Sequence, residues 1–525
     1  MSFLDKQHTV APANFNRWLV PPAALAIHLS IGMAYGFSVF WLPLSKAIGI
    51  TKPAAADWKI STLGWTYTLF FVLLGSSAAI FGAWLEKHGP RKAGVVAALC
   101  WSGGLFLSAL GVYWHQLWLL WLGAGVIGGC GLGLGYISPV STLIKWFPDK
   151  RGMATGMAIM GFGGGAMIGA PLADKLMKHF ASATSAGIWE TFVTLGVIYL
   201  VAMLAGAFTY RIPAPGWKPH GWTAPAPTEN AMITRGHVHV RSAHRAPQFW
   251  LLWAVLCLNV SAGIGIIGMA SPMLQEVFGG RLIGLDAPLA ALTADQKAKV
   301  ASIGAGFAGL LSLFNIGGRI FWASLSDKLG RQRTYRIFFV LGLVLYLAAA
   351  YAGGTKNMLL FVALFCAILT MYGGGFATIP AYLADLFGTQ YVGAIHGRLL
   401  TAWSTAGVLG PVLVNYLREF QIGRGVPVAS AYNVAFYVMA GLLFLGFLSN
   451  LLVRPVDEHH FMSEDELEEE WQLAKSKAAP TPSGFESAKA SAASWAGVAV
   501  GWTFVGVPLA WGILKTVEKA ANLFR

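Results

Sequence analysis

Charged residues are scarce in this 525-residue chain, because aspartate, glutamate, lysine and arginine together make up only 11% of it. A soluble globule of this length needs more polar surface to face water, so a soluble fold is excluded. Hydrophobic residues make up 56% of the chain and form runs long enough to cross a bilayer. The sequence therefore predicts an all-α integral membrane protein that crosses the lipid bilayer many times.

The chain also lacks the residue patterns of cofactor sites and enzymes. Its four cysteines stand singly within apolar runs, without the paired spacing of disulfides or metal ligands. The net charge of +14 is carried mainly by short segments between apolar runs, which is typical of membrane topology rather than of nucleic-acid binding. We therefore expect no metal, no cofactor, no nucleic-acid partner and no enzymatic activity, and nothing implies an oligomer.

The apolar runs form two sets of six, separated by a polar segment rich in proline and histidine. The expected order is an N-terminal cytoplasmic segment, a six-helix half, a cytoplasmic linker, a second six-helix half, an acidic tail with a linker, and an extra hydrophobic helix. These units cover residues 1–17, 18–211, 212–247, 248–453, 454–490 and 491–525. The last run is long enough for a thirteenth transmembrane helix, although its glycines and Pro508 leave an interfacial helix or a hairpin open.

The two halves are copies of each other. One offset of 241 positions aligns an acidic pair, a proline pair and four glycine pairs without a gap. The pairs are Glu86 and Asp327, Gly89 and Gly330, Pro139 and Pro380, Gly152 and Gly393, Gly156 and Gly397, and Gly169 and Gly410. Two repeated halves joined by a central loop predict a transporter that binds its substrate between the halves, near the membrane midplane.

Lysine and arginine are more numerous on one predicted side of the membrane than on the other. The N-terminal segment and the even-numbered loops carry seventeen of them, against eleven on the opposite side. Because positive residues accumulate in cytoplasmic loops, we expect a multi-pass protein of the cell inner (plasma) membrane with a cytoplasmic N-terminus.

An arginine stands within an apolar run of the second half. Arg319 lies eight residues before Asp327, where a polar loop begins, so we place it about 12 Å inside the membrane. A charge at this depth costs roughly 2.5 to 3.5 kcal/mol, which favours a substrate site. Alternatively, Arg319 extends toward the interface or pairs with a neighbouring helix for structure alone. The repeat offset aligns it with Ala78, so the first half has no matching charge.

Two loops at the repeat offset, Gly82 to Lys92 and Ala323 to Arg333, resemble the loop signature of the major facilitator superfamily. An acidic residue at a helix end and nearby bases form ion pairs that hold one conformation closed. The expected gating residues are Glu86, Arg91, Asp327, Lys328 and Arg331. The first copy is expected to latch less tightly, because Glu86 replaces the usual aspartate and Pro90 replaces a base. A charged loop that serves only topology is the alternative.

A second resemblance is narrower. The segment from Gly131 to Gly152, which contains GLGLGYISPV, closely resembles the fourth helix and following loop of the oxalate/formate antiporter family, relatives of monocarboxylate transporters. This resemblance extends to Asn315 and Arg319 and implies that Arg319 binds a substrate carboxylate. A guanidinium offers two parallel donors to one carboxylate. Tyr136 is expected to line the path, although packing alone explains the glycines.

The chain departs from that family in the eleventh span, where Trp403 stands at the position of a second cation. A dianion would face one fixed positive charge, whereas a monocarboxylate fits one arginine and an aromatic wall. We therefore expect a secondary transporter of small carboxylates, namely monocarboxylates such as lactate, pyruvate or formate, that works by alternating access. An oxalate/formate (dicarboxylate) antiporter and a transporter-like carboxylate sensor are the alternatives.

The coupling ion is a separate question, because no aspartate or glutamate is expected at midplane depth. His28 lies near the midplane of the first span and shares a helix face with Tyr35. It is a candidate proton site or substrate donor, and a histidine satisfied by packing is the alternative. Proton symport and anion exchange both stay open. The expected substrate-binding residues are Arg319, Asn315, Tyr136, Trp403, His28 and Tyr35.

Overall fold

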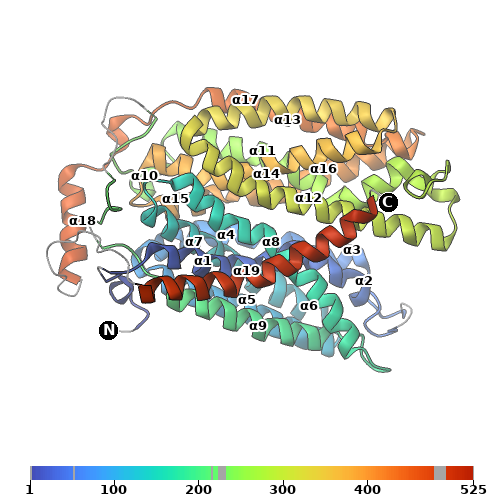
Figure 1. Ribbon diagram of the computed structural model, residues 1–525, viewed down its shortest axis with the longest axis horizontal. Coiled ribbons are helices and arrows are strands. Elements are labelled where there is room, and N and C mark those ends of the chain that lie inside the picture. Colours follow the sequence, from blue (N-terminus) through green and yellow to red (C-terminus); the bar gives the residue numbers. More distant parts are fainter. Residues whose placement is uncertain are drawn as a thin grey trace.

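The computed structural model describes residues 3–12, 14–50, 54–214, 217–222, 232–477 and 492–523. Helices dominate this part of the chain, and its extended contacts are two isolated β-bridges, from Val10 to Ile212 and from Val238 to Phe461. The helices lie side by side along the long axis of the molecule (Figure 1). The predicted all-α membrane fold is confirmed.

The first half begins with α1 (Val20–Ile31), which continues through a 3-10 segment (Gly32–Phe40) into α2 (Trp41–Leu44). The segments that follow are α3 (Ile60–Leu63), α4 (Trp65–His88), α5 (Pro90–Tyr113), α6 (Leu117–Leu120), α7 (Gly129–Trp146), α8 (Arg151–Phe180) and α9 (Ile188–Thr209). A π-helical stretch (Trp121–Gly128) joins α6 to α7, so that these two form one crossing.

The second half follows the short linker helix α10 (Val240–Ala243). Its helices are α11 (Pro247–Phe278), α12 (Ala294–Leu329), α13 (Arg331–Gly354), α14 (Met358–Phe387), α15 (Val392–Leu399), α16 (Thr401–Gly423) and α17 (Asn433–Leu451). Two further helices, α18 (Glu464–Lys477) and α19 (Ala492–Ala520), complete the described part of the chain.

In that part, 12 helices are long and apolar enough to cross a membrane. They include α19 but not the pair α15–α16, which occupies the position of the predicted eleventh span. This pair is interrupted at Leu400, and α16 carries Arg418 and Glu419 near its end. With α15–α16 in the bundle, the structure has the twelve predicted crossings and α19 as the extra helix.

The helix α19 lies across the seam between the two halves. Its beginning packs on α1, where Gly501 meets Pro22, and its middle packs on α8, where Gly512 meets Met167. Its end packs on Gly306 of α12, in the second half. In Figure 1 it runs as a red diagonal along the bundle, away from the end where α18 lies. A single continuous helix is not a hairpin, and the length and composition of α19 suffice for a membrane span.

The linker and the acidic tail meet at the end of the bundle that holds the N-terminus (Figure 1). Val238 bridges to Phe461, and the Thr234 backbone N–H donates to the Asp385 carbonyl at 2.7 Å. The acidic helix α18 contacts the second half through Glu470 and the hydroxyl of Tyr391. The predicted linker after it, through residue 490, lies outside the described residues from residue 478 onward.

Candidate substrate site between the two halves

The helix α12 brings Arg319 to the contact between the halves, where its side chain is fully buried. Its Nε donates to Oδ1 of Asn315 at 3.0 Å, as their i, i+4 spacing on one helix face allows. Its Nη1 donates to the backbone carbonyl of Ile159, on α8, at 2.7 Å. Arg319 therefore belongs to the second half but binds the backbone of the first.

The Arg319 guanidinium lies close to the Tyr35 hydroxyl but has no counter-ion among the described residues. Its Nη2 is buried without a hydrogen-bond partner, and no carboxylate among the described residues forms an ion pair with it. A buried charge without a counter-ion is costly, because the protein interior solvates it poorly. Since Nη1 and Nη2 form one edge of the guanidinium, a ligand with two parallel anionic acceptors would complete the site.

Aromatic rings from both halves cluster beside this guanidinium. We call them the aromatic box: Tyr35, Tyr136, Phe162, Phe376 and Trp403. The Trp403 ring centroid lies 5.1 Å from that of Tyr136, 5.2 Å from Phe162 and 4.5 Å from Phe376. The Arg319 Cζ lies 5.7 Å from the Phe376 centroid. The Tyr136 hydroxyl and the Trp403 Nε1 are also buried without partners, so two further donors are free.

The structure brings the six predicted substrate residues into one region, but His28 does not face the guanidinium. Tyr35 sits in the aromatic box, and its hydroxyl is 3.3 Å from that of Tyr372. His28 packs behind the box, with its ring centroid 5.2 Å from that of Tyr136. Both of its ring nitrogens face backbone carbonyls rather than the guanidinium. The substrate-binding roles of all six residues remain predictions.

Sequence reasoning missed three aromatic residues of this region. Phe162 lies 241 positions before Trp403, so the repeat offset pairs the two rings that touch here, and that signal could have found it. Phe376 and Tyr372 are one turn apart on α14, which is apolar along most of its length and offers no distinguishing pattern. Arg398, five residues before Trp403, donates to the Val240 carbonyl in the linker. It therefore supplies no second cation to the box.

Four charged residues join the halves at the end of the bundle that holds the linker. We call Arg151, Asp327, Arg331 and Asp385 the gate cluster. Asp385 accepts from Arg151 Nη1 at 2.9 Å and from Arg331 Nε at 3.0 Å, and Arg331 Nη2 pairs with Asp327 at 2.7 Å. Because Arg151 belongs to the first half and Asp385 to the second, their pair holds the halves together.

Asp327 adds a second contact across the gate cluster. Its carboxylate accepts the backbone N–H groups of Gly152 at 2.8 Å and Met153 at 3.0 Å, at the start of α8. A carboxylate is stabilised there by unpaired N–H groups and by the helix dipole. Burial lowers the pKa of the nearby linker residue His237, and the positive charge of Arg151 lowers that pKa further. His237 therefore adds little positive charge to the gate cluster at neutral pH.

The first motif copy forms a different contact. Glu86 pairs with Lys145 Nζ at 2.6 Å and accepts from Ser141 at 3.0 Å, both within the first half. Arg91 donates to the carbonyls of Phe3 and Tyr210, and Lys328 is exposed. Of the expected gating residues, the structure therefore brings only Asp327 and Arg331 into the gate cluster. The partners Asp385, Arg151 and Lys145 were not predicted.

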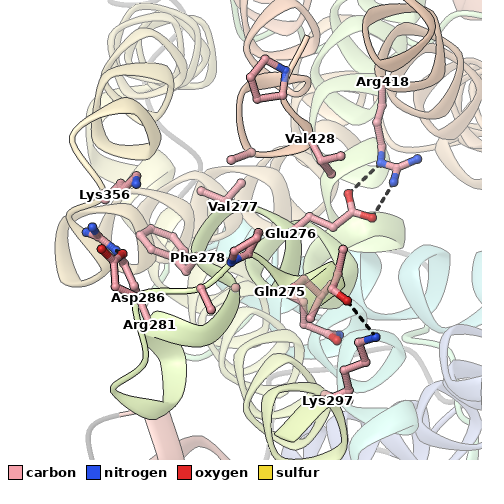
Figure 2. Close-up of a pocket in the computed structure, with 18 residues that line it drawn as sticks. Gln275, Glu276, Val277, Phe278, Arg281, Asp286, Lys297, Lys356, Arg418 and Val428 are labelled. Atoms are coloured by element: carbon pink, nitrogen blue, oxygen red, sulfur yellow. Dashed lines mark hydrogen bonds and ion pairs between the residues drawn. The ribbon is translucent and has the colours of Figure 1, made fainter. Parts of the chain in front are cut away.

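A cavity of about 890 Å³ lies at the other end of the second half (Figure 2). On its wall Arg418 pairs with Glu276, with Nε and Oε2 2.7 Å apart, and Lys297 donates to the Ala290 carbonyl. The charged lining residues are Arg281, Lys297, Lys356, Arg418, Glu276 and Asp286. The cavity is built from one half and contains none of the predicted substrate residues. It is therefore not the site between the halves, although its excess of basic residues favours the approach of anions.

Comparison with known proteins agrees with this architecture. The sequence profile of the Major Facilitator Superfamily matches residues 15–411 and again residues 287–517. The chain is 26% identical over 443 residues to the oxalate:formate antiporter of Oxalobacter formigenes, which covers 84% of this chain and 92% of the relative. It is 27% identical over 390 residues to apicoplast pyruvate carrier 1 of Toxoplasma gondii, covering 65% and 66% of the two chains.

A solved structure gives the same fold. The transporter FucP in its outward conformation matches with a TM-score of 0.56 at 14% identity, over 83% of this chain and 99% of FucP. The resemblance to oxalate/formate antiporters drawn from the motifs is confirmed by the Oxalobacter relative. The profile covers most of the chain in two overlapping matches. The protein is therefore a multi-pass membrane transporter rather than an enzyme, and it belongs to the Major Facilitator Superfamily.

Proposed function

We propose that the protein is a secondary carrier of small monocarboxylates, such as lactate, pyruvate or formate, and that these anions bind at Arg319. The observation that carries this proposal is the buried guanidinium with its unpaired Nη2 inside the aromatic box. A carboxylate accepts two parallel hydrogen bonds from such a group and supplies the missing negative charge.

The aromatic box supports a monoanion over a dianion. One carboxylate neutralises Arg319, while the hydroxyl of Tyr136 and the indole N–H of Trp403 offer further donors. A small apolar substituent would lie against Phe162 and Phe376. A second carboxylate would be buried without a partner cation, because Arg398 is bound to the linker.

Two levels of contact between the halves support alternating access. At the gate cluster the halves are held by Asp385 with Arg151, and by Asp327 with the start of α8. At the level of the site they are held by Arg319 and the Ile159 carbonyl. With a cytoplasmic N-terminus, the gate cluster closes the cytoplasmic side, and rocking of the halves breaks its cross-half contacts.

Oxalate and formate exchange is the second candidate, because the Oxalobacter relative is named an oxalate:formate antiporter. Counterflow into proteoliposomes separates the candidates. Vesicles loaded with unlabelled formate, lactate, pyruvate or oxalate receive the same labelled anion outside. We expect counterflow of the monocarboxylates and little of oxalate. Strong oxalate exchange would favour the second candidate. Absence of transport of all four anions would contradict both and would favour a transporter-like sensor.

A further inference from the structure

His28 lies in α1 with each ring nitrogen facing a backbone carbonyl of the same half. Nδ1 is 2.5 Å from the Ala158 oxygen on α8, and Nε2 is 3.1 Å from the Tyr136 oxygen on α7. A neutral imidazole has one N–H donor, so it satisfies one of these carbonyls and turns a lone pair toward the other. The imidazolium donates to both. The two carbonyls therefore favour the protonated ring, whereas complete burial of His28 disfavours it, so protonation needs a further compensating charge nearby.

The same stretch of α8 joins His28 to the substrate site. His28 faces the carbonyl of Ala158, and Arg319 donates to the carbonyl of Ile159, the next residue. Two positive charges this close oppose each other, so an unliganded Arg319 disfavours the imidazolium. A carboxylate bound at Arg319 cancels that repulsion. A proton at His28 and a carboxylate at Arg319 therefore stabilise each other, and the coupling is reciprocal.

Few ionisable groups among the described residues face His28. Tyr136 of α7 lies against its ring, Arg319 of α12 lies beyond, and His396 of α15 packs on the far side of Tyr136, with ring centroids 5.9 Å apart. The other elements packed on α1 present small or apolar residues to it, and Arg17, three turns below His28, is paired with Asp149. These neighbours are Gly161 and Phe162 of α8, Gly206 of α9, Gly94 of α5 and Gly501 of α19.

We propose that His28 is the proton-binding site that couples carboxylate transport to proton transport, an inference that rests on the proposed function. The proton comes from water on the side to which the site is open and adds to the unprotonated ring nitrogen of His28. After the halves rock, it leaves to water on the opposite side, and no other bond forms or breaks. One proton then accompanies each monocarboxylate.

His28→Gln and His396→Gln form a matched pair of variants, because both histidines are buried beside Tyr136 but only His28 lies between two carbonyls. Lactate uptake is measured in proteoliposomes in two ways: accumulation driven by an inward proton gradient, and counterflow without a gradient. We expect His28→Gln to lose the gradient-driven accumulation and to retain counterflow only at a raised KM for lactate, because exchange moves no net proton but the variant lacks the charge that favours the bound carboxylate. We expect His396→Gln to keep both.

The inference is overturned if His28→Gln still accumulates lactate on a proton gradient, or if His396→Gln alone loses that accumulation. A second measurement tests the inference even if the His28→Gln variant does not fold, because it uses the wild-type protein. In wild-type vesicles with an internal pH dye, an inward lactate gradient should carry one proton per lactate inward. Lactate transport without proton movement overturns the role of His28 and leaves the proposed function standing. Absence of any carboxylate transport by the wild type would overturn both.

Discussion

Replacing Asp385 by asparagine should shift the protein toward the state in which the gate cluster is open. The variant keeps the shape of the side chain and removes its charge. Asp385 binds Arg151 across the halves and Arg331 within its own half, so only the first pair is lost when the gate opens. A hydrogen bond to a charged group contributes about 1.5–3 kcal/mol.

Solvent reduces that value, because the Arg151 side chain is 19% exposed. A contribution of about 1–2 kcal/mol to the closed state remains. The ratio of open to closed molecules should therefore rise about 5- to 30-fold. Asp149→Asn is the matched control, because Asp149 pairs with Arg17 at 2.7 Å with a similar exposure. Arg17 directly precedes the first half and Asp149 belongs to it, so their pair does not join the two halves and survives opening.

Distances between two spin labels report the shift. Lys87 at the end of α4 and Arg336 near the start of α13 are exposed, and they lie on different halves at the gate end. After replacement of the four native cysteines, labels at these positions give a distance distribution by double electron–electron resonance. Asp385→Asn should enlarge the long-distance population, whereas Asp149→Asn should not. An unchanged distribution, or an equal shift in the control, would refute the reasoning.

Two glycine substitutions, each with a control substitution, test the packing. Gly152→Ala places a methyl group against the Ala323 carbonyl and Asp327, and overpacking costs about 1–3 kcal/mol, so it should lengthen the same label distance. Gly103→Ala, with no neighbour within 4 Å, should leave that distance unchanged. Gly512→Leu should push α19 away from Met167 and lower the thermal midpoint of the protein in detergent. Gly506→Leu, also without a neighbour within 4 Å, should not, and equal drops would contradict the position of α19 on the seam.

The sequence predicted the helices, the repeat and the central arginine because these leave periodic or local signals. Arg319 and Asn315 share one face of α12 by their spacing alone, and Trp403 was found by comparison with the family pattern in the eleventh span. The repeat offset of 241 positions, applied to Trp403, would have found Phe162. The offset identifies equivalent positions in the two halves, and here the two equivalent rings contact each other where the halves meet.

Ion-pair partners could not be predicted in the same way. The loop motif named Asp327 and Arg331 but not Asp385, because that pairing depends on how the end of α14 meets α13 and the start of α8. Arg91 was expected in the gate, yet carbonyls of the N-terminal segment and of Tyr210 hold it elsewhere. The position of α19 on the seam could not be predicted, because its apolar sequence has no pattern that indicates which helices it packs against.

The affinity of Arg319 variants for lactate tests the central claim most directly. Removing one partner of a buried, hydrogen-bonded charge pair costs about 2–5 kcal/mol. Arg319→Gln should therefore weaken lactate binding to the purified protein, measured by calorimetry, by about 30- to 5,000-fold. Arg336→Gln, which changes an exposed arginine on α13, should bind lactate like the wild type. If Arg319→Gln binds lactate as tightly as Arg336→Gln, Arg319 is not the carboxylate site.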